Sequence, residues 1–154
     1  VQILGYNISP DDAYLALRGL RTLNVRLKRH ETSALKIAKW LSNRPEIDRI
    51  LHPALSSCPG HEIWQRDFSG SNGLFGVVFK PLSERAMHTF IDGLELFSLG
   101  GSWGGYESLV LPTNITRTVT KWKNNDQCIR FHIGLENPDD LIRDIERSLK
   151  SIKN

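Results

Sequence analysis

The sequence predicts an α+β domain, a small mostly antiparallel sheet covered by helices on one face and preceded by a long N-terminal helical arm. Two observations lead to this class. Apolar residues follow a helical period near both ends of the chain, and short runs typical of strands lie between them, with short connections. The expected internal boundary separates the helical arm, residues 1–44, from a sheet domain, residues 45–154.

The arm begins with a helix-start signal. Ser9 can cap a helix, Pro10 suits the first helical position, and the two aspartates that follow favour the positive end of the helix dipole. A helix is therefore expected up to residues 43–45, with a break near Gly19 or His30. Its apolar face is Ala13, Leu17, Leu20, Leu23, Leu27, Leu35, Ala38 and Leu41.

The middle of the chain alternates between strand and loop signals. Residues 46–54 hold a short extended stretch around Ile50, and residues 56–73 are rich in glycine, serine and polar residues. We expect a long surface connection there, with one helical turn at 61–66. Residues 73–80 form an apolar run typical of a buried strand.

The C-terminal half adds two helices and three strands. Ser83 caps a helix that ends near Gly93, and short strands at 94–99 and 108–111 flank a glycine-rich turn. Residues 128–134 alternate with a period of two and present one apolar face. Asn137 and Pro138 repeat the cap-plus-proline start. The last helix presents Leu141, Ile142, Ile145, Leu149 and Ile152.

Composition excludes several classes of function. Twenty basic and 17 acidic residues leave a formal charge of +3. The basic residues are dispersed, so nucleic acid is not an expected partner. Apolar runs fall far short of the roughly 18 residues of a membrane helix, and no signal peptide opens the chain, so no membrane partner and a cytoplasmic location are expected.

Cysteine and histidine spacing predicts no metal site. Cys58 and Cys128 lie far apart and are expected to be reduced and structural. The five histidines form no pair with helical ligand spacing. They are His30, His52, His61, His88 and His132. The chain also lacks a nucleophile elbow and a phosphate-binding loop of the Walker type.

Arg130 is the first candidate for a functional role. It lies in the middle of a predicted strand, on the face opposite Ile129 and Phe131. A guanidinium there must reach solvent or find an anion, because burial of an unpaired charge is costly. Its planar fork suits a carboxylate. The alternative is a sheet with one wet face, on which Arg130 points outward.

The second candidate is the segment SWGGYESL at 102–109. Its adjacent glycines permit backbone conformations that allow close approach to a ligand, and Ser102 with its neighbouring amides can donate to an anion. The alternative is an ordinary turn between strands, with Trp103 and Tyr106 as packing residues.

Together these segments resemble the Cys/Met-metabolism family of pyridoxal-phosphate enzymes of fold type I, and most closely its bacterial cystathionine β-lyase branch. The resemblance covers nearly the whole chain, and its motifs occur in the family's order. They are RGLRT at 18–22, HPAL at 52–55, GH at 60–61, RDF at 66–68, GLF at 73–75, FSL at 97–99, SWGGYESL at 102–109 and IRFHIGLE at 129–136.

The resemblance implies a fold and a chemistry. In such enzymes a lysine holds pyridoxal 5'-phosphate as a Schiff base, and L-cystathionine is cleaved to homocysteine, pyruvate and ammonia in methionine biosynthesis. Arg130 matches the arginine that binds the carboxylate of the amino-acid substrate. Ser102 and Trp103 match the positions that complete this pocket, Trp103 chiefly through its backbone. The full-length enzymes are implied to be tetramers.

The family's cofactor lysine segment would precede Val1, as would the phosphate-binding residues. We therefore expect no catalytic and no cofactor-binding residue here, a missing N-terminal cofactor domain as partner, and no activity of the chain alone. Lys121, in a superficially similar Thr-Lys-Trp segment, is interpreted as a solvated loop lysine. The alternative function is a stand-alone binding or assembly module. The arm should expose apolar surface and favour self-association.

Overall fold

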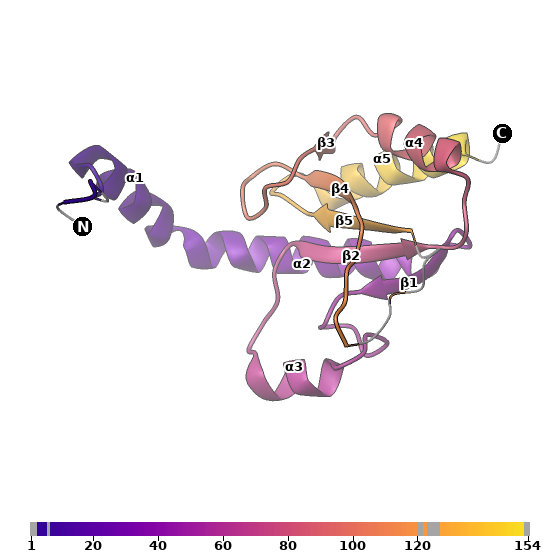
Figure 1. Ribbon diagram of the computed structural model, residues 1–154, viewed down its shortest axis with the longest axis horizontal. Coiled ribbons are helices and arrows are strands. Elements are labelled where there is room, and N and C mark those ends of the chain that lie inside the picture. Colours follow the sequence, from indigo (N-terminus) through magenta and orange to yellow (C-terminus); the bar gives the residue numbers. More distant parts are fainter. Residues whose placement is uncertain (1–2, 6, 120–121, 123–126, 153–154) are drawn as a thin grey trace.

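The computed structural model describes residues 3–5, 7–119, 122 and 127–152 (Figure 1). It contains five helices and a five-stranded sheet, which confirms the predicted α+β class. The elements are α1 (Pro10–Arg21), α2 (Leu23–Leu41), β1 (Ile47–Leu51), α3 (His61–Asp67), β2 (Leu74–Phe79), α4 (Glu84–Asp92), β3 (Ser98–Leu99), β4 (Leu109–Thr113), β5 (Cys128–His132) and α5 (Pro138–Ser151).

Side-chain caps start three of the helices where the sequence predicts them. The Ser9 hydroxyl accepts from the N–H of Asp12 at α1, Ser83 caps α4, and the Asn137 side chain caps α5. Each cap satisfies a backbone donor that has no partner within its helix. The arm breaks at Thr22, close to the predicted Gly19, and His30 continues α2.

The sheet has the strand order β1-β2-β5-β4-β3. Its three longer pairings are antiparallel, and β3 pairs with β4 in parallel, so the expectation of a mostly antiparallel sheet is confirmed. Two strand predictions were too long. Residues 94–97 precede β3 without strand structure, and β5 ends at His132 instead of residue 134.

Helices α2, α4 and α5 pack over one face of the sheet and enclose the core (Figure 1). The inward side chains of β5 are Ile129 and Phe131, both almost fully buried. From His30 onward, α2 contributes buried side chains to this core. The domain boundary predicted after residue 44 is not tested by this structure and remains a prediction.

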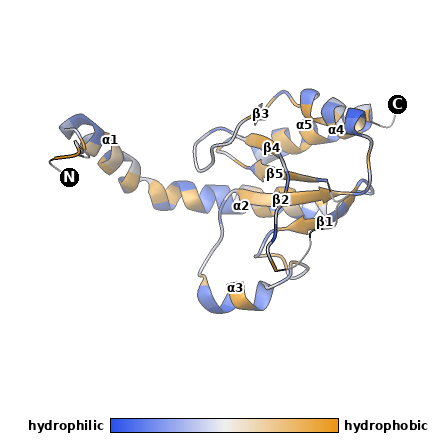
Figure 2. Ribbon diagram, viewed as in Figure 1, coloured by the Kyte–Doolittle hydropathy of each residue, from blue (hydrophilic) through white to orange (hydrophobic). Residues whose placement is uncertain are grey.

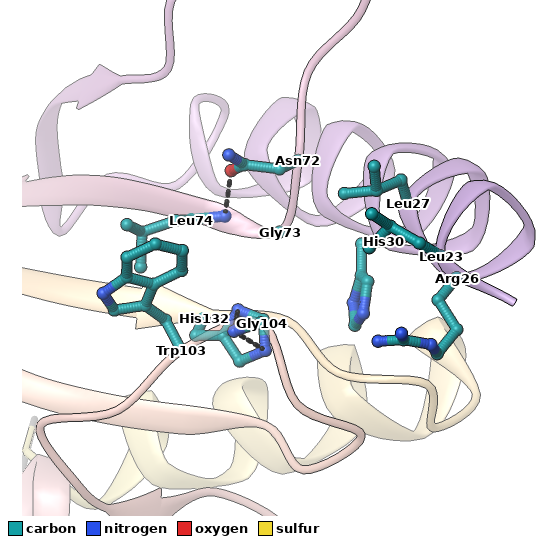
Figure 3. A pocket seen from close by; sticks show the side chains of 10 residues that line it. All are labelled: Leu23, Arg26, Leu27, His30, Asn72, Gly73, Leu74, Trp103, Gly104 and His132. Carbon is teal, nitrogen blue, oxygen red and sulfur yellow. Dashed lines mark hydrogen bonds between the residues drawn. The ribbon is translucent and has the colours of Figure 1, made fainter. Parts of the chain in front are cut away.

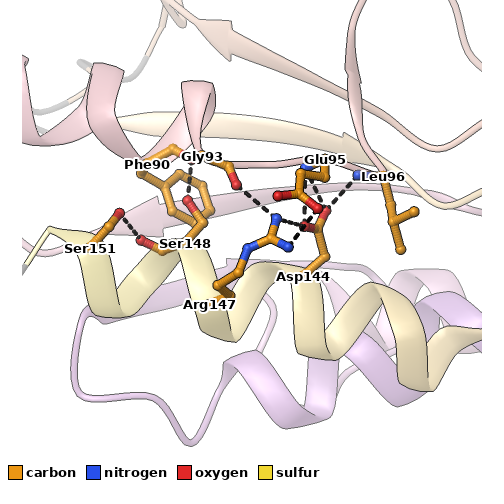
Figure 4. A network of polar contacts seen from close by, with 8 residues as sticks. All are labelled: Phe90, Gly93, Glu95, Leu96, Asp144, Arg147, Ser148 and Ser151. Carbon is orange, nitrogen blue, oxygen red and sulfur yellow. Dashed lines mark hydrogen bonds and ion pairs between the residues drawn. The ribbon is translucent and has the colours of Figure 1, made fainter.

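A polar network on α5 ties this helix to the chain between α4 and β3 (Figure 4). The buried carboxylate of Asp144 accepts from the N–H groups of Glu95 and Leu96, and Arg147 donates to Asp144 and to the carbonyl of Gly93. These contacts set the path on which the chain leaves α4 for β3.

The N-terminal half of the arm extends away from the sheet (Figure 1), and α1 has no buried residue. Apolar segments are nevertheless visible along α1 and the start of α2 (Figure 2). Leu20 is 64% exposed and Val25 is 73% exposed. The expected exposed apolar surface of the arm is therefore present. No described helix is long and apolar enough to cross a membrane.

Candidate functional site

Arg130 lies in the middle of β5, between β2 and β4. It is opposite Gly76 on β2 and Leu111 on β4, while its neighbours Ile129 and Phe131 point into the core. The guanidinium therefore lies on the face away from the helices, as the alternation predicts. At Gly76 a side chain would crowd Cys128, because an added Cβ would lie 3.3 Å from its Sγ.

The loop between β3 and β4 folds over the Arg130 side chain. Arg130 Nη2 donates to the backbone carbonyls of Gly100 (3.2 Å), Gly101 (2.9 Å) and Ser102 (3.1 Å). The Nε atom is buried and has no partner among the described residues. Arg130 thus points away from the core, but its side chain is only half-exposed because the loop covers it, and its Nε donor has no partner there.

His132 holds the same loop two residues further along β5. The N–H of Gly104 donates to His132, 3.1 Å from Nε2 and 3.4 Å from Nδ1, and Nε2 lies 3.2 Å from the carbonyl of Gly105. Gly104 has φ +83°, a backbone conformation that favours glycine. Gly104 and Gly105 thus form a tight turn, which places the N–H of Gly104 and the carbonyl of Gly105 within hydrogen-bond distance of the His132 ring.

Glu136 anchors the end of the loop. Its carboxylate accepts from the N–H of Ser108 (2.7 Å) and from the Ser108 hydroxyl (2.8 Å). The hydroxyl in turn accepts from the N–H of Gly134, where an added Cβ would lie 2.2 Å from the carbonyl oxygen of Tyr106. The loop is thus fastened at successive points along residues 130–136.

A pocket of about 250 Å³ opens between α2, the start of β2 and this loop (Figure 3). His132 and Trp103 lie on its loop side, and Leu23, Leu27 and His30 lie on its α2 side. His30 Nδ1 donates to the carbonyl of Ile133 (2.7 Å), and the rings of His30 and His132 are 5.3 Å apart. His30 thus packs beside His132, the histidine that is hydrogen-bonded to the loop.

The electrostatic surroundings keep His132 neutral. Burial lowers the pKa of His132 below 6.5, and the nearby His30 and Arg130 lower it further. The carbonyl of Gly105 and the carboxylate of Glu136 oppose this effect but do not cancel it.

Two aromatic side chains of the loop are exposed. Trp103 is 60% exposed and Tyr106 is 68% exposed, so the predicted alternative in which they serve as packing residues is wrong for this structure. A hydrogen bond to Glu107 raises the pKa of Tyr106. The face that carries Arg130 is therefore bordered by exposed aromatic rings, which are common where proteins meet ligands or other protein surfaces.

Pyridoxal phosphate needs a lysine amine for its Schiff base, and no described lysine lines the pocket between α2 and the loop. Lys121 lies outside the described residues. The described part of the chain also contains no group of three metal-ligating side chains. Both cysteines carry thiols, and burial raises the pKa of Cys58.

Arg130, Ser102 and Trp103 were predicted to share one site, and in the structure Arg130 Nη2 lies 3.1 Å from the carbonyl oxygen of Ser102. The roles of His132 and Glu136, which are hydrogen-bonded to the loop, were not predicted from the sequence. One sequence feature could have indicated His132. It lies two residues after Arg130 on the same strand, so both side chains are on the same face of the sheet. Its partner Gly104 is 28 residues away in sequence, beyond the reach of a local pattern.

The fold and the site define an α+β domain in which a glycine-rich loop is hydrogen-bonded to an arginine of the central strand. Residues 1–150 match the family model described as Cys/Met metabolism PLP-dependent enzyme. The chain belongs to this family.

Individual relatives agree with the family match. A putative cystathionine beta-lyase of Rhizobium johnstonii is 51% identical over 94% of this chain and 38% of its own length. The cystathionine beta-lyase of Escherichia coli is 45% identical over 97% of this chain and 40% of its own length. The chain thus spans less than half the length of these relatives.

A solved structure shows the same fold. Cystathionine gamma synthase from Xanthomonas oryzae pv. oryzae, in complex with aminoacrylate and cysteine, superposes with a TM-score of 0.85. It is 34% identical, and the match covers 98% of this chain and 41% of that chain.

Proposed function

We propose that the whole protein carrying this chain is a pyridoxal-phosphate-dependent cystathionine β-lyase, in which this chain supplies the site for the substrate α-carboxylate. The family membership and the relatives named cystathionine beta-lyase support the reaction class. The buried, unpartnered Nε of Arg130 is the observation that supports the site.

The arrangement suits a carboxylate clamp. Nη2 is held by three loop carbonyls, which orient the guanidinium plane and join it to the segment that carries Ser102 and Trp103. A substrate carboxylate would accept from the remaining N–H groups of Arg130, and a small rearrangement of the loop would admit it. Such a clamp fixes the orientation of the amino acid as well as its affinity.

The cofactor is assigned to another part of the whole protein. When bound, it would serve as the electron sink for elimination, and its lysine is proposed to lie outside this chain. We therefore propose that this chain is inactive alone. The proposal includes a cytoplasmic homo-oligomer, and the exposed apolar arm is the feature that supports contact with further protein surface.

The test is Arg130→Ala in the whole protein. Loss of a paired charged donor should reduce kcat/KM for L-cystathionine by about 10²–10³-fold, mainly through KM. The visible absorbance of the bound cofactor should not change, because Arg130 is not proposed to contact it.

The matched control is Arg143→Ala. Arg143 is a surface arginine of α5 whose side chain is 70% exposed. Its removal should leave kcat/KM within about twofold, because exposed ion pairs contribute little. Near-normal kinetics of Arg130→Ala would exclude the assigned site.

A further inference from the structure

We propose that His132 is a positioning residue, whose ring holds the Gly104–Gly105 turn and thereby keeps Ser102 and Trp103 next to Arg130. The inference rests on the proposed carboxylate site, since His132 acts on that site's loop. His132 itself is almost fully buried, so the role requires no contact with substrate.

The loop depends on two side chains for its middle section. At its start the N–H of Gly100 donates to the carbonyl of Val110, and near its end the carbonyl of Tyr106 accepts from Leu135. Between these points, Arg130 donates to the carbonyls of residues 100–102, and His132 is hydrogen-bonded to residues 104 and 105. Trp103 lies between the two attachments.

The neutral ring can hold the turn in either tautomer. With the proton on Nδ1, Nε2 accepts from the N–H of Gly104 at 3.1 Å. With the proton on Nε2, that nitrogen donates to the carbonyl of Gly105, and Nδ1 accepts from Gly104 at 3.4 Å. The imidazolium donates at both nitrogens, so Gly104 then loses its acceptor.

The groups that surround the His132 ring determine the pH at which the ring becomes protonated. His30 faces it from α2, Arg130 lies beside it on β5, Glu136 follows β5, and Arg26 lines the same pocket. Because burial lowers the pKa of His132, the ring is neutral near pH 7. The Gly104 contact is therefore present above the lowered pKa and is lost as the pH falls through it.

The first experiment follows the Gly104 amide of this chain by NMR between about pH 8 and about pH 4. In the native sequence its resonance should titrate with a midpoint below the ordinary histidine pKa of roughly 6.5. His132→Gln should keep a protected Gly104 amide without that titration, because its amide group offers both an acceptor and a donor. His132→Phe should accelerate hydrogen exchange at Gly104 by about tenfold.

The control is His88→Gln, the same substitution at an exposed histidine of α4. It should leave the Gly104 titration unchanged. Either of two results would overturn the positioning role. One is a Gly104 amide resonance that does not change with pH in the native chain. The other is a native rate of hydrogen exchange at Gly104 in His132→Phe.

The second experiment places His132→Phe and His132→Gln in the whole protein. His132→Phe should raise KM for L-cystathionine by about tenfold with little change of kcat, and His132→Gln should restore it. If Arg130→Ala does not change kcat/KM while the Gly104 amide still titrates with His132, the proposed carboxylate site is wrong. The hydrogen bond between His132 and the Gly104–Gly105 turn is then still supported. If Arg130→Ala lowers kcat/KM as expected and His132→Phe changes neither the Gly104 amide nor KM, only the positioning role fails.

Discussion

At Asp144 a single carboxylate satisfies two backbone donors. The side chain is 2% exposed and accepts from the N–H groups of Glu95 and Leu96. Asp144→Asn keeps the shape but replaces one acceptor oxygen by an amide donor. We expect a loss of about 2–3 kcal/mol in the free energy of unfolding, because charge-assisted hydrogen bonds are lost in a buried place. Urea denaturation of this chain measures it.

Asp140→Asn is the matched comparison on the same helix. The Asp140 side chain is 45% exposed and pairs with Arg143. We expect less than about 1 kcal/mol there, since surface ion pairs and helix-end charges contribute little. Equal losses in the two variants would mean that the Asp144 network does not stabilise the fold.

The two helices of the arm differ sharply in what they contribute to stability. Helix α1 has no buried residue, whereas Ile37 of α2 is fully buried in the core. At low protein concentration, where the chain is monomeric, Leu17→Ala should therefore change the free energy of unfolding by less than about 0.5 kcal/mol. Ile37→Ala should cost about 2–5 kcal/mol, because it removes buried area and leaves a cavity.

Urea denaturation at two protein concentrations checks this contrast. A large cost for Leu17→Ala that is independent of concentration would show that α1 packs within its own chain. A cost that appears only at the higher concentration would show that it packs between chains.

Elements whose signals are local could be predicted from the sequence. The cap residues Ser9, Ser83 and Asn137 each lie directly before a helix and bond to a backbone N–H at most three residues later. All three predicted caps are confirmed. The break at Thr22 was located only approximately, because it is stabilised by Arg26, which donates to the carbonyl of Gly19 from the next helix. The parallel pairing of β3 with β4 depends on a loop path that no periodicity encodes.

The candidate site combines local and long-range information. The strand that carries Arg130 and the glycine turn of the loop are both readable in the sequence, as is the family motif that contains them. Their proximity was predicted only through the family resemblance, because the loop carbonyls are 28 to 30 residues away from Arg130 and no local pattern connects them. The pairing of Ser108 with Glu136 also spans 28 residues and has no pattern of its own.

For the molecule as a whole, the exposed apolar face of the arm is the main departure from an ordinary domain surface. Leu17 and Leu20 of α1 and Leu27 of α2 form an apolar series along the arm, and all three are at least 40% exposed. Apolar faces of this kind are typically covered by other protein surface. We expect the isolated chain to self-associate through this series, with sedimentation coefficients that rise with concentration.

Leu20→Lys should weaken this association by about tenfold or more, because burial of one leucine contributes roughly 1.5–3 kcal/mol. Val25→Lys is the matched control, since Val25 is 73% exposed but lies outside the series. Sedimentation velocity of the three proteins over a range of concentrations distinguishes the cases. A monomeric native chain at every concentration would show that the arm face does not bind its own copy. Equal weakening by both lysines would mean that the apolar series is not the contact surface.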